Sequence, residues 1–391
     1  MDGPAGVSSW HLTSVPCGRV SGHPSADRGL STASLASVAR ENLTSVPIMG
    51  ISPLSLEPVL VAKPWGGQFL AQTYRRDRGG DARIGECWLV ADLPPDQTAV
   101  PDPWSVVASG RHIGCRLEAV IASSARHLLG SVAPLHGRFP LLMKVLDAEE
   151  HLSVQVHPTD AYANENPGVT SKTESWLVLE ARPDACLYLG VKDGVARDDV
   201  RRAAGRSDLV DLLRKLPPQP GDLHHLPAGM VHALGAGVRV LEVQTPSDTT
   251  FRLYDWRDEF QRQPRPLHVT EGLEVIESAW DVNIDPRRFT YRTAREHGLL
   301  LDTAAYQIYR HDLQAEVPLE SATGRARVLY AVDGQVGGDG FERPIRSGEV
   351  VLLPACWRVR SCPTLAPSSS RFESVQPVTD QQGGASHPGA A

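Results

Sequence analysis

The sequence predicts a mainly β protein, organised as two barrels of one architecture with a few helices packed at one side. Between about residues 51 and 363, short apolar or alternating runs are separated by Gly, Pro and Asp, as in an all-β sandwich or barrel. Helical periodicity is confined to three segments. A turn-and-strand pattern at 221–229 recurs loosely at 347–355, which indicates a duplicated unit.

The two ends of the chain differ from this central part. Residues 1–50 are rich in Gly, Ser, Pro and Ala without a sustained period, so we expect a disordered or non-native N-terminal extension. Met49 precedes the first strand-like run and is a plausible internal start. The tail 364–391 is expected to be disordered as well. At 391 residues and 41% hydrophobic, the chain is long enough for two domains with cores, placed at 51–284 and 285–363.

The expected elements follow the chain in order. Strand-like runs in the first domain are Val59–Val61, Cys87–Ala91, Trp176–Leu179, Cys186–Leu189 and Val238–Val243. Those in the second are Tyr306–Tyr309, Ala326–Val332 and Glu349–Pro354. The expected helices are Arg116–Leu129, Asp198–Leu216 and Val269–Ser278, and prolines 217 and 218 end the second of them.

Charge and cysteine usage exclude several classes of function. The net charge is −7 and no long basic run occurs, so binding to nucleic acid or an acidic membrane through bulk charge is not expected. No apolar run reaches transmembrane length, and no signal-peptide pattern is recognised. The six cysteines are scattered without CxxC spacing, which indicates reduced thiols in a cytoplasmic protein.

A row of polar side chains organises the first domain. The alternating run 152–157 predicts a half-buried strand with Ser153, Gln155 and His157 on one face. Glu174 opens the next strand-like run, and a Gln, a His and a Glu on neighbouring strands suit a divalent metal such as zinc. For any one of these residues alone, an ordinary exposed strand face is the first interpretation, so the metal hypothesis needs a fourth ligand.

His232 supplies that ligand. Alone it would be read as a core histidine beside an apolar strand, but the other three residues require a partner. His224 and His225 lack this context and are interpreted as structural. In the second copy of the pattern Cys356 and Trp357 follow the Leu-Pro-Ala sequence, so the second barrel is expected to lack metal.

Three charged residues crowd an otherwise apolar or small segment downstream: Glu242, Asp248 and Arg252. Such residues are either paired for structure or held for chemistry. An arginine near a metal presents a planar fork that suits a phosphate or an enediolate oxygen.

Seven motifs in order resemble the type I mannose-6-phosphate isomerases, zinc enzymes of the cupin fold, and most closely their shorter bacterial form. They are Lys63–Gly67, Ile84–Trp88, Pro140–Ala148, Gln155–Pro158, Lys172–Trp176, Pro227–Ala233 and Ser247–Arg252. The resemblance covers about Ile51 to Pro363. It implies two cupin (jelly-roll) domains, of which 51–284 is catalytic and bears the metal, with helical insertions.

The resemblance also implies roles for individual residues. One zinc ion per chain would be held by Gln155, His157, Glu174 and His232, although some short-form members carry lysine where Gln155 stands. Ser153 and Lys144 would reach the substrate, at its phosphate. Lys172 and Arg252 would lie near the reacting carbons, oriented by Glu242 and Asp248. Longer members have a lysine shortly after the matching arginine, and Arg257 is the candidate here for that phosphate contact.

The implied reaction interconverts mannose 6-phosphate and fructose 6-phosphate through a cis-enediol(ate), with zinc stabilising the developing charge. Lys172 is a candidate base if burial and the metal favour its neutral form; a metal-bound water, a histidine and Asp248 are alternatives. A different sugar-phosphate isomerase, acting for example on glucose 6-phosphate, and a non-catalytic sugar-phosphate-binding cupin remain open. The expected partner is a small sugar phosphate, and the expected state a monomer or weak homodimer.

Overall fold

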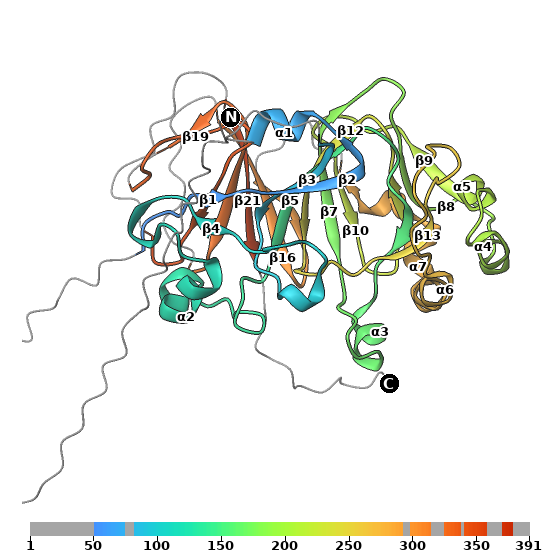
Figure 1. The fold of residues 1–391 in the computed structure, drawn as a ribbon, viewed down its shortest axis with the longest axis horizontal. Helices are drawn as coiled ribbons and strands as arrows, with labels where there is room; N and C mark the ends of the chain where they lie inside the picture. Colours follow the sequence, from blue (N-terminus) through green and yellow to red (C-terminus); the bar gives the residue numbers. More distant parts are fainter. Residues whose placement is uncertain are drawn as a thin grey trace, which may run out of the picture. The chain divides into compact units, whose positions relative to one another are not determined.

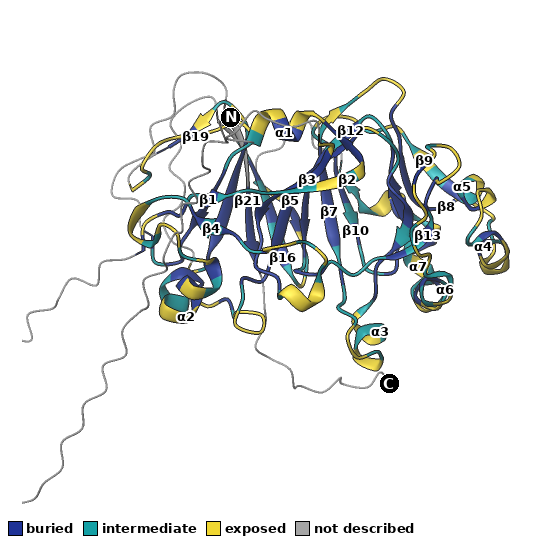
Figure 2. Cartoon of the chain, in the orientation of Figure 1, coloured by how far each residue is buried: buried dark blue, intermediate teal, exposed yellow. Residues whose placement is uncertain are grey.

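The computed structural model describes residues 51–74, 82–291, 298–313, 324–337, 340–357 and 370–377. The N-terminal extension 1–50 and residues 364–369 and 378–391 of the tail lie outside this part. Within it the chain is mainly β, with three larger antiparallel sheets and two small ones (Figure 1). Figure 2 shows that the strands are mostly buried, whereas exposed residues gather on the helices and connecting loops.

A seven-stranded sheet forms the middle layer, in the order β14–β10–β7–β12–β5–β2–β3. Its strands are β2 (Val59–Gly67), β3 (Ile84–Val90), β5 (Leu142–Ala148), β7 (Glu174–Ala181), β10 (Leu223–Leu226), β12 (Val238–Gln244) and β14 (Thr290–Tyr291). Strands β3 and β5 are buried along their whole length because both faces of this sheet are covered.

A five-stranded sheet covers one face of the middle layer, in the order β13–β6–β11–β8–β9. Its strands are β6 (Val154–Val156), β8 (Leu187–Val191), β9 (Leu213–Leu216), β11 (His232–Leu234) and β13 (Phe251–Tyr254). Leu187 and Leu234 of this sheet share a buried cluster with Leu146 and Trp176 of the middle sheet. The outer face packs against α4 (Arg197–Ala203), α5 (Asp208–Leu212), α6 (Val269–Ser278) and α7 (Trp280–Ile284).

A second five-stranded sheet covers the opposite face, in the order β15–β16–β21–β17–β20. Its strands are β15 (Gly298–Asp302), β16 (Tyr306–Leu313), β17 (Arg327–Asp333), β20 (Val350–Leu353) and β21 (Ser370–Pro377). Ile308 and Val375 pack there against Leu177 and Leu241 of the middle sheet. The far face of this C-terminal sheet packs on the hairpin of β18 (Gln335–Val336) and β19 (Ile345–Arg346).

The remaining elements are short, apart from α2. They are β1 (Leu56–Glu57), α1 (Phe69–Tyr74), η1 (Pro95–Gln97), β4 (Val106–Val107), η2 (Gly110–His112), α2 (Leu117–Leu128), α3 (Asp160–Glu165) and η3 (Pro286–Phe289). Helix α3 begins where the Thr159 hydroxyl accepts a hydrogen bond from the Tyr162 amide, a standard N-cap contact. No helix in the described ranges is long and apolar enough to cross a membrane.

The structure confirms all the expected strands and two of the three expected helices. α2 and α6 match their predicted segments. The single helix expected at Asp198–Leu216 is wrong: the segment forms α4 and α5 and ends as strand β9. Leu213–Leu216 pairs with β8 at the sheet edge, so tertiary pairing overrides the helical pattern.

Two expectations about architecture also need correction. The tail expected to be disordered from residue 364 contains β21, which pairs with both β16 and β17 in the middle of the C-terminal sheet. The described strands form open, layered sheets and none of these sheets closes into a barrel.

Candidate functional site

Three predicted metal ligands converge between the middle sheet and the sheet that carries β6 and β11. His232 begins β11 and pairs across the ladder with Gln155 of β6, while His157 follows directly after β6. Glu174 begins β7 in the facing sheet. Potential ligand atoms of His157, Glu174 and His232 all lie within 4.8 Å of one another, and all three residues are buried. Across the described ranges, this is the one group of His, Cys, Asp or Glu close enough to hold a metal.

Hydrogen bonds to backbone carbonyls fix which ring nitrogen of each histidine faces the cluster. His157 Nδ1 lies 3.0 Å from the Thr249 oxygen, and His232 Nδ1 lies 2.8 Å from the Met230 oxygen. A carbonyl oxygen can only accept, so each Nδ1 carries the proton and donates it. Each Nε2 then presents a lone pair and lies 3.3 Å from a Glu174 carboxylate oxygen. This is the arrangement that metal-binding histidines adopt.

The cluster fits a divalent metal by its chemistry. His157 Nε2 and Glu174 Oε1 are buried without a hydrogen-bond partner among the described residues, a costly state for polar atoms. Burial, followed by the charge of Lys172, lowers the pKa of His157 to about 3, which keeps this ring neutral and able to coordinate.

Gln155 can complete the set. Its amide nitrogen lies 3.2 Å from His232 Nε2, and its oxygen accepts a hydrogen bond of 3.1 Å from the Ser153 hydroxyl. Rotating the amide would bring its carbonyl oxygen to the cluster instead. Two imidazoles, a carboxylate and an amide oxygen are donors that suit zinc and its first-row neighbours.

A row of alternating charges extends from the cluster across the middle sheet. Lys172 Nζ lies 2.7 Å from Glu174 Oε2 and 3.5 Å from Glu242 Oε1. Lys144 Nζ lies 3.1 Å from the same Glu242 oxygen and 3.6 Å from Glu86 Oε2. Lys63 Nζ ends the row at 2.9 Å from Glu86 Oε1. We call the set Lys63, Glu86, Lys144, Glu242 and Lys172 the ionic row.

Indole groups hold both carboxylates of the ionic row in place. Trp176 Nε1 donates to Glu242 over 3.0 Å, and Trp88 Nε1 donates to Glu86 over 2.7 Å. Burial opposes the charge on Glu86, yet the two neighbouring lysines hold its pKa well below the ordinary value. Burial would likewise lower the pKa of Lys144, but Glu242 and then Glu86 raise it above the ordinary value. Glu86 and Lys144 are therefore charged although they are buried.

A polar cavity of about 200 Å³ opens beside the row and the cluster. It is lined by Lys63, Trp65, Glu86, Lys144, Leu146, Leu152, Ser153, Gln155, Lys172, Glu242, Asp248, Thr250, Arg252 and Arg265. Five of these side chains are cationic and three are acidic, which favours an anionic ligand.

Most of the predicted substrate and catalytic residues meet in this cavity, namely Ser153, Lys144, Lys172, Glu242, Asp248 and Arg252. The Asp248 carboxylate accepts a hydrogen bond of 2.7 Å from the Thr98 hydroxyl. Arg252 pairs with Gln155 across the β13–β6 ladder, and its Nη1 donates to the Pro266 oxygen over 2.8 Å.

The Arg257 side chain does not line this cavity. It is 58% exposed and contacts Asp258. Sequence reasoning assigned no role to Lys63, Glu86 or Arg265. The first two lie in motifs that carried the family resemblance, whereas Arg265 has no local sequence signal.

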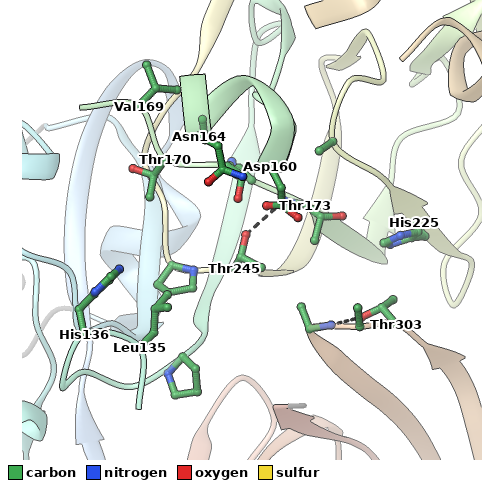
Figure 3. Close-up of a pocket in the computed structure, with 18 residues that line it drawn as sticks. Leu135, His136, Asp160, Asn164, Val169, Thr170, Thr173, His225, Thr245 and Thr303 are labelled. Atoms are coloured by element: carbon green, nitrogen blue, oxygen red, sulfur yellow. Dashed lines mark hydrogen bonds between the residues drawn. The ribbon is translucent and has the colours of Figure 1, made fainter. Parts of the chain in front are cut away.

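Figure 3 shows a second cavity, which has a volume of about 630 Å³. Its walls come from α3, the turn around His136, the segment Val169–Thr173 and the turn at Thr303. Lys172 is the one predicted catalytic residue in its lining. His225, which the sequence analysis interpreted as structural, also lines this cavity, and its Nδ1 lies 3.0 Å from the Ser175 hydroxyl oxygen. Of these two cavities, the one of about 200 Å³ therefore gathers more of the predicted site residues.

The sequence matches both a family model and a curated relative. Residues 54–174 match the model of the phosphomannose isomerase type I catalytic domain. The chain is 35% identical over 320 residues to mannose-6-phosphate isomerase ManA of Bacillus subtilis (strain 168), covering 78% of this chain and 94% of that relative.

Solved structures agree in fold. The mannose 6-phosphate isomerase structure from Bacillus subtilis superimposes with a TM-score of 0.65 at 26% identity, covering 83% of this chain and 99% of its own. A mannose 6-phosphate isomerase bound with zinc and yttrium gives a TM-score of 0.62 at 17% identity, covering 84% and 100%. Because this chain is 35% identical to ManA and the match covers 94% of ManA, the chain belongs to the type I phosphomannose isomerase family.

Proposed function

We propose that the protein is a zinc-dependent aldose–ketose isomerase that interconverts mannose 6-phosphate and fructose 6-phosphate. The observation that carries this proposal is the cluster of His157, Glu174 and His232, beside which Gln155 lines one cavity together with Lys172 and Arg252. The names of the relatives support the substrate, and the zinc-bound isomerase of the same fold supports the metal. The assignment of zinc over other divalent metals rests on the donor set.

The reaction moves a proton between C2 and C1 of the sugar through a cis-enediol(ate), so one base on one face is required. Bound by Gln155, His157, Glu174 and His232, zinc would supply Lewis-acid stabilisation of the negative charge that develops on the sugar oxygens. In this proposal Arg252, which pairs with Gln155 in the ladder, stabilises the same charge with its guanidinium N–H groups.

Two side chains of the cavity are candidates for moving the proton. The Asp248 carboxylate accepts one hydrogen bond from Thr98 and retains further lone pairs. Lys172 Nζ lies 2.7 Å from Glu174 and 3.5 Å from Glu242, and in this proposal it orients the sugar hydroxyls. In this proposal Asp248 is the favoured base and Lys172 the positioning cation.

The roles predict a split in kinetic constants. Arg252→Ala should lower mainly kcat, because the charge that it stabilises appears only in the transition state. Lys144→Ala should raise mainly KM, because it contacts the bound ground state as well. Steady-state kinetics of both variants test this, and equal effects on both constants in both variants would contradict the assignment.

The first experiment is an assay of purified protein for conversion of mannose 6-phosphate to fructose 6-phosphate, before chelation, after chelation and after zinc is restored. Loss and recovery of activity establish the reaction and its metal together. A stoichiometric metal without this activity would favour another sugar phosphate, and a panel that includes glucose 6-phosphate identifies it. Inactivity with the whole panel, with retained sugar-phosphate binding, would favour a binding protein.

We also propose that the layered sheets represent two cupin units, as the family resemblance implies. The catalytic unit would be 51–284, and strand β21 extends the second from the expected 285–363 to Pro377. The cytoplasmic location and the monomer or weak homodimer stay predictions, which fractionation and light scattering can test.

A further inference from the structure

The loop between β13 and α6, residues 255–268, is held against the rest of the catalytic region at several points. The Trp256 indole donates to the Leu152 oxygen over 2.7 Å. Arg262, almost fully buried, lies 3.0 Å from Glu150. Trp256 has φ of 52°, a left-handed backbone conformation that a large side chain rarely adopts. The loop is thus fixed in place beside the cavity.

Within this loop, Asp255 orients the guanidinium group of Arg265. The Asp255 carboxylate is 5% exposed, and its Oδ2 lies 2.7 Å from Arg265 Nε. A second N–H of Arg265 donates to Oδ1, so the contact has two points and fixes the plane of the guanidinium. This contact leaves the other N–H donors of Arg265 available, and the side chain lines the cavity.

Three arginines approach this one carboxylate: Arg252, Arg262 and Arg265. Arg252 Nε lies 3.8 Å from Asp255 Oδ1 and has no hydrogen-bond partner among the described residues. Burial, and then the positive charge of Arg265, lowers the pKa of Arg252. The positive charges of Arg252 and Arg265 lie so close together that one carboxylate does not neutralise both. This end of the cavity therefore favours the binding of a further anion.

The order of neighbours indicates which part of the substrate this anion is. From the metal cluster, Gln155 neighbours Arg252, and Arg252 reaches Arg265 through Asp255. The reacting carbons belong at the cluster, so the group at Arg265 is the one remote from them. We propose that Arg265, positioned by Asp255, binds the phosphate group of the substrate, the role that the family resemblance suggested for Arg257. This inference rests on the proposed function, because it takes the substrate to be a sugar phosphate.

The test uses the full-length, zinc-loaded protein and compares Arg265→Ala, Arg265→Lys and Arg257→Ala with the unchanged chain. Arg265→Ala should raise KM for mannose 6-phosphate by about 10- to 100-fold with kcat changed by less than about threefold, since a charge-assisted contact is lost in ground and transition states alike. Arg265→Lys should give an intermediate KM, because lysine keeps the charge but not the fork. The exposed Arg287, paired with Asp285, provides a neutral control as Arg287→Ala.

A second readout does not depend on activity. Calorimetric titration with inorganic phosphate should show binding to the unchanged protein and at least about tenfold weaker binding to Arg265→Ala. Asp255→Asn should raise KM by a smaller factor and leave kcat, because it loosens the orientation of Arg265 without removing it. Unfolding midpoints and zinc content identify any variant that is misfolded.

The outcomes separate this inference from the proposed function. Active protein in which Arg265→Ala leaves KM and phosphate binding unchanged overturns the role of Arg265 alone. A raised KM in Arg257→Ala, with Arg265→Ala unaffected, overturns it in favour of Arg257. If the unchanged protein isomerises no sugar phosphate, the proposed function fails, and the phosphate titration still decides whether Arg265 forms an anion site.

Discussion

The repeated turn in the catalytic region and its counterpart in the C-terminal sheet start from the same local design. In each copy a strand ends at a buried leucine, Leu226 or Leu353, and Pro-Ala then leads into a turn. The Met230 amide donates to the Pro227 oxygen over 3.1 Å, and the Trp357 amide donates to the Pro354 oxygen over 2.9 Å. The backbone pattern is therefore shared up to this point.

The next residues make the two regions different. Gly229 has φ of +89°, whereas Cys356, at the matching position, is not among the described non-glycine residues with positive φ. After the first turn the chain enters β11 and brings His232 to Glu174. After the second, Trp357 fills an apolar cluster in which its ring contacts Phe341. One turn thus leads to a buried charged site and the other to an apolar core, so the fold alone does not assign function.

The largest expected effect comes from removing the residue that distinguishes the first copy. His232→Ala should abolish stoichiometric metal binding and lower kcat/KM on the order of 10³-fold or more, because it removes several kcal/mol of charge stabilisation. Metal analysis and steady-state kinetics measure both effects. His311→Ala, a histidine of the C-terminal sheet that contacts Ser374, is the control and should retain metal and activity. A fully loaded, active His232→Ala protein would remove the basis of the comparison.

In the second copy, a substitution is expected to lower stability without changing metal content or activity. Trp357→Ala should reduce the free energy of unfolding by about 3–5 kcal/mol, because it leaves a cavity in an apolar cluster. The folded fraction should keep its metal content and kcat. Urea unfolding and metal analysis of the same preparation check this. Loss of metal without loss of stability would show that the C-terminal sheet takes part in the site.

The convergence of His157, Glu174 and His232 was predictable from sequence because its signals are local. Alternation placed Gln155 and His157 on one strand face, and turn residues preceded His232. Arg265 and strand β21 were not predictable in this way. Arg265 reaches the cavity through a contact with Asp255 ten residues away in a loop, and β21 exists because β16 and β17 flank it. The helix predicted to end at Leu216 failed for the same reason, since pairing with β8 decides the state of its last residues.

The buried histidine of the first region should also make stability depend on pH in the metal-free protein. The pKa of His157 is about 3 in the folded state and near 6.5 when the chain is unfolded, because burial disfavours the charged ring. Between these values only the unfolded chain takes up the proton, so stability is present above about pH 6.5 and declines toward pH 3. The slope from this group is at most about 1.4 kcal/mol per pH unit.

Urea unfolding at pH 7, 6, 5 and 4, with chelator present, measures this slope. His157→Gln should remove it and show a shallower decline over the same range. An unchanged slope in the variant would mean that other groups of the chain account for the acid sensitivity.

The smallest effect tests the turn itself. Gly229→Ala should cost about 1–3 kcal/mol, because its φ disfavours any side chain and an added Cβ would lie 2.2 Å from the Ala279 Cβ. The Gly229 amide donates to the His157 backbone oxygen, and the Gly229 oxygen accepts from the Asn283 side chain. Displacing Gly229 should therefore also weaken metal binding.

Cys356→Gly is the matched variant, because it introduces glycine at the same position of the second turn. It should cost only about 0.5–1 kcal/mol through chain entropy and leave metal affinity unchanged. Competition titration with a chelator ranks the two variants. If Gly229→Ala holds metal as tightly as Cys356→Gly does, the glycine is not what directs His232 into the site, and the divergence of the two copies must lie in the residues that follow.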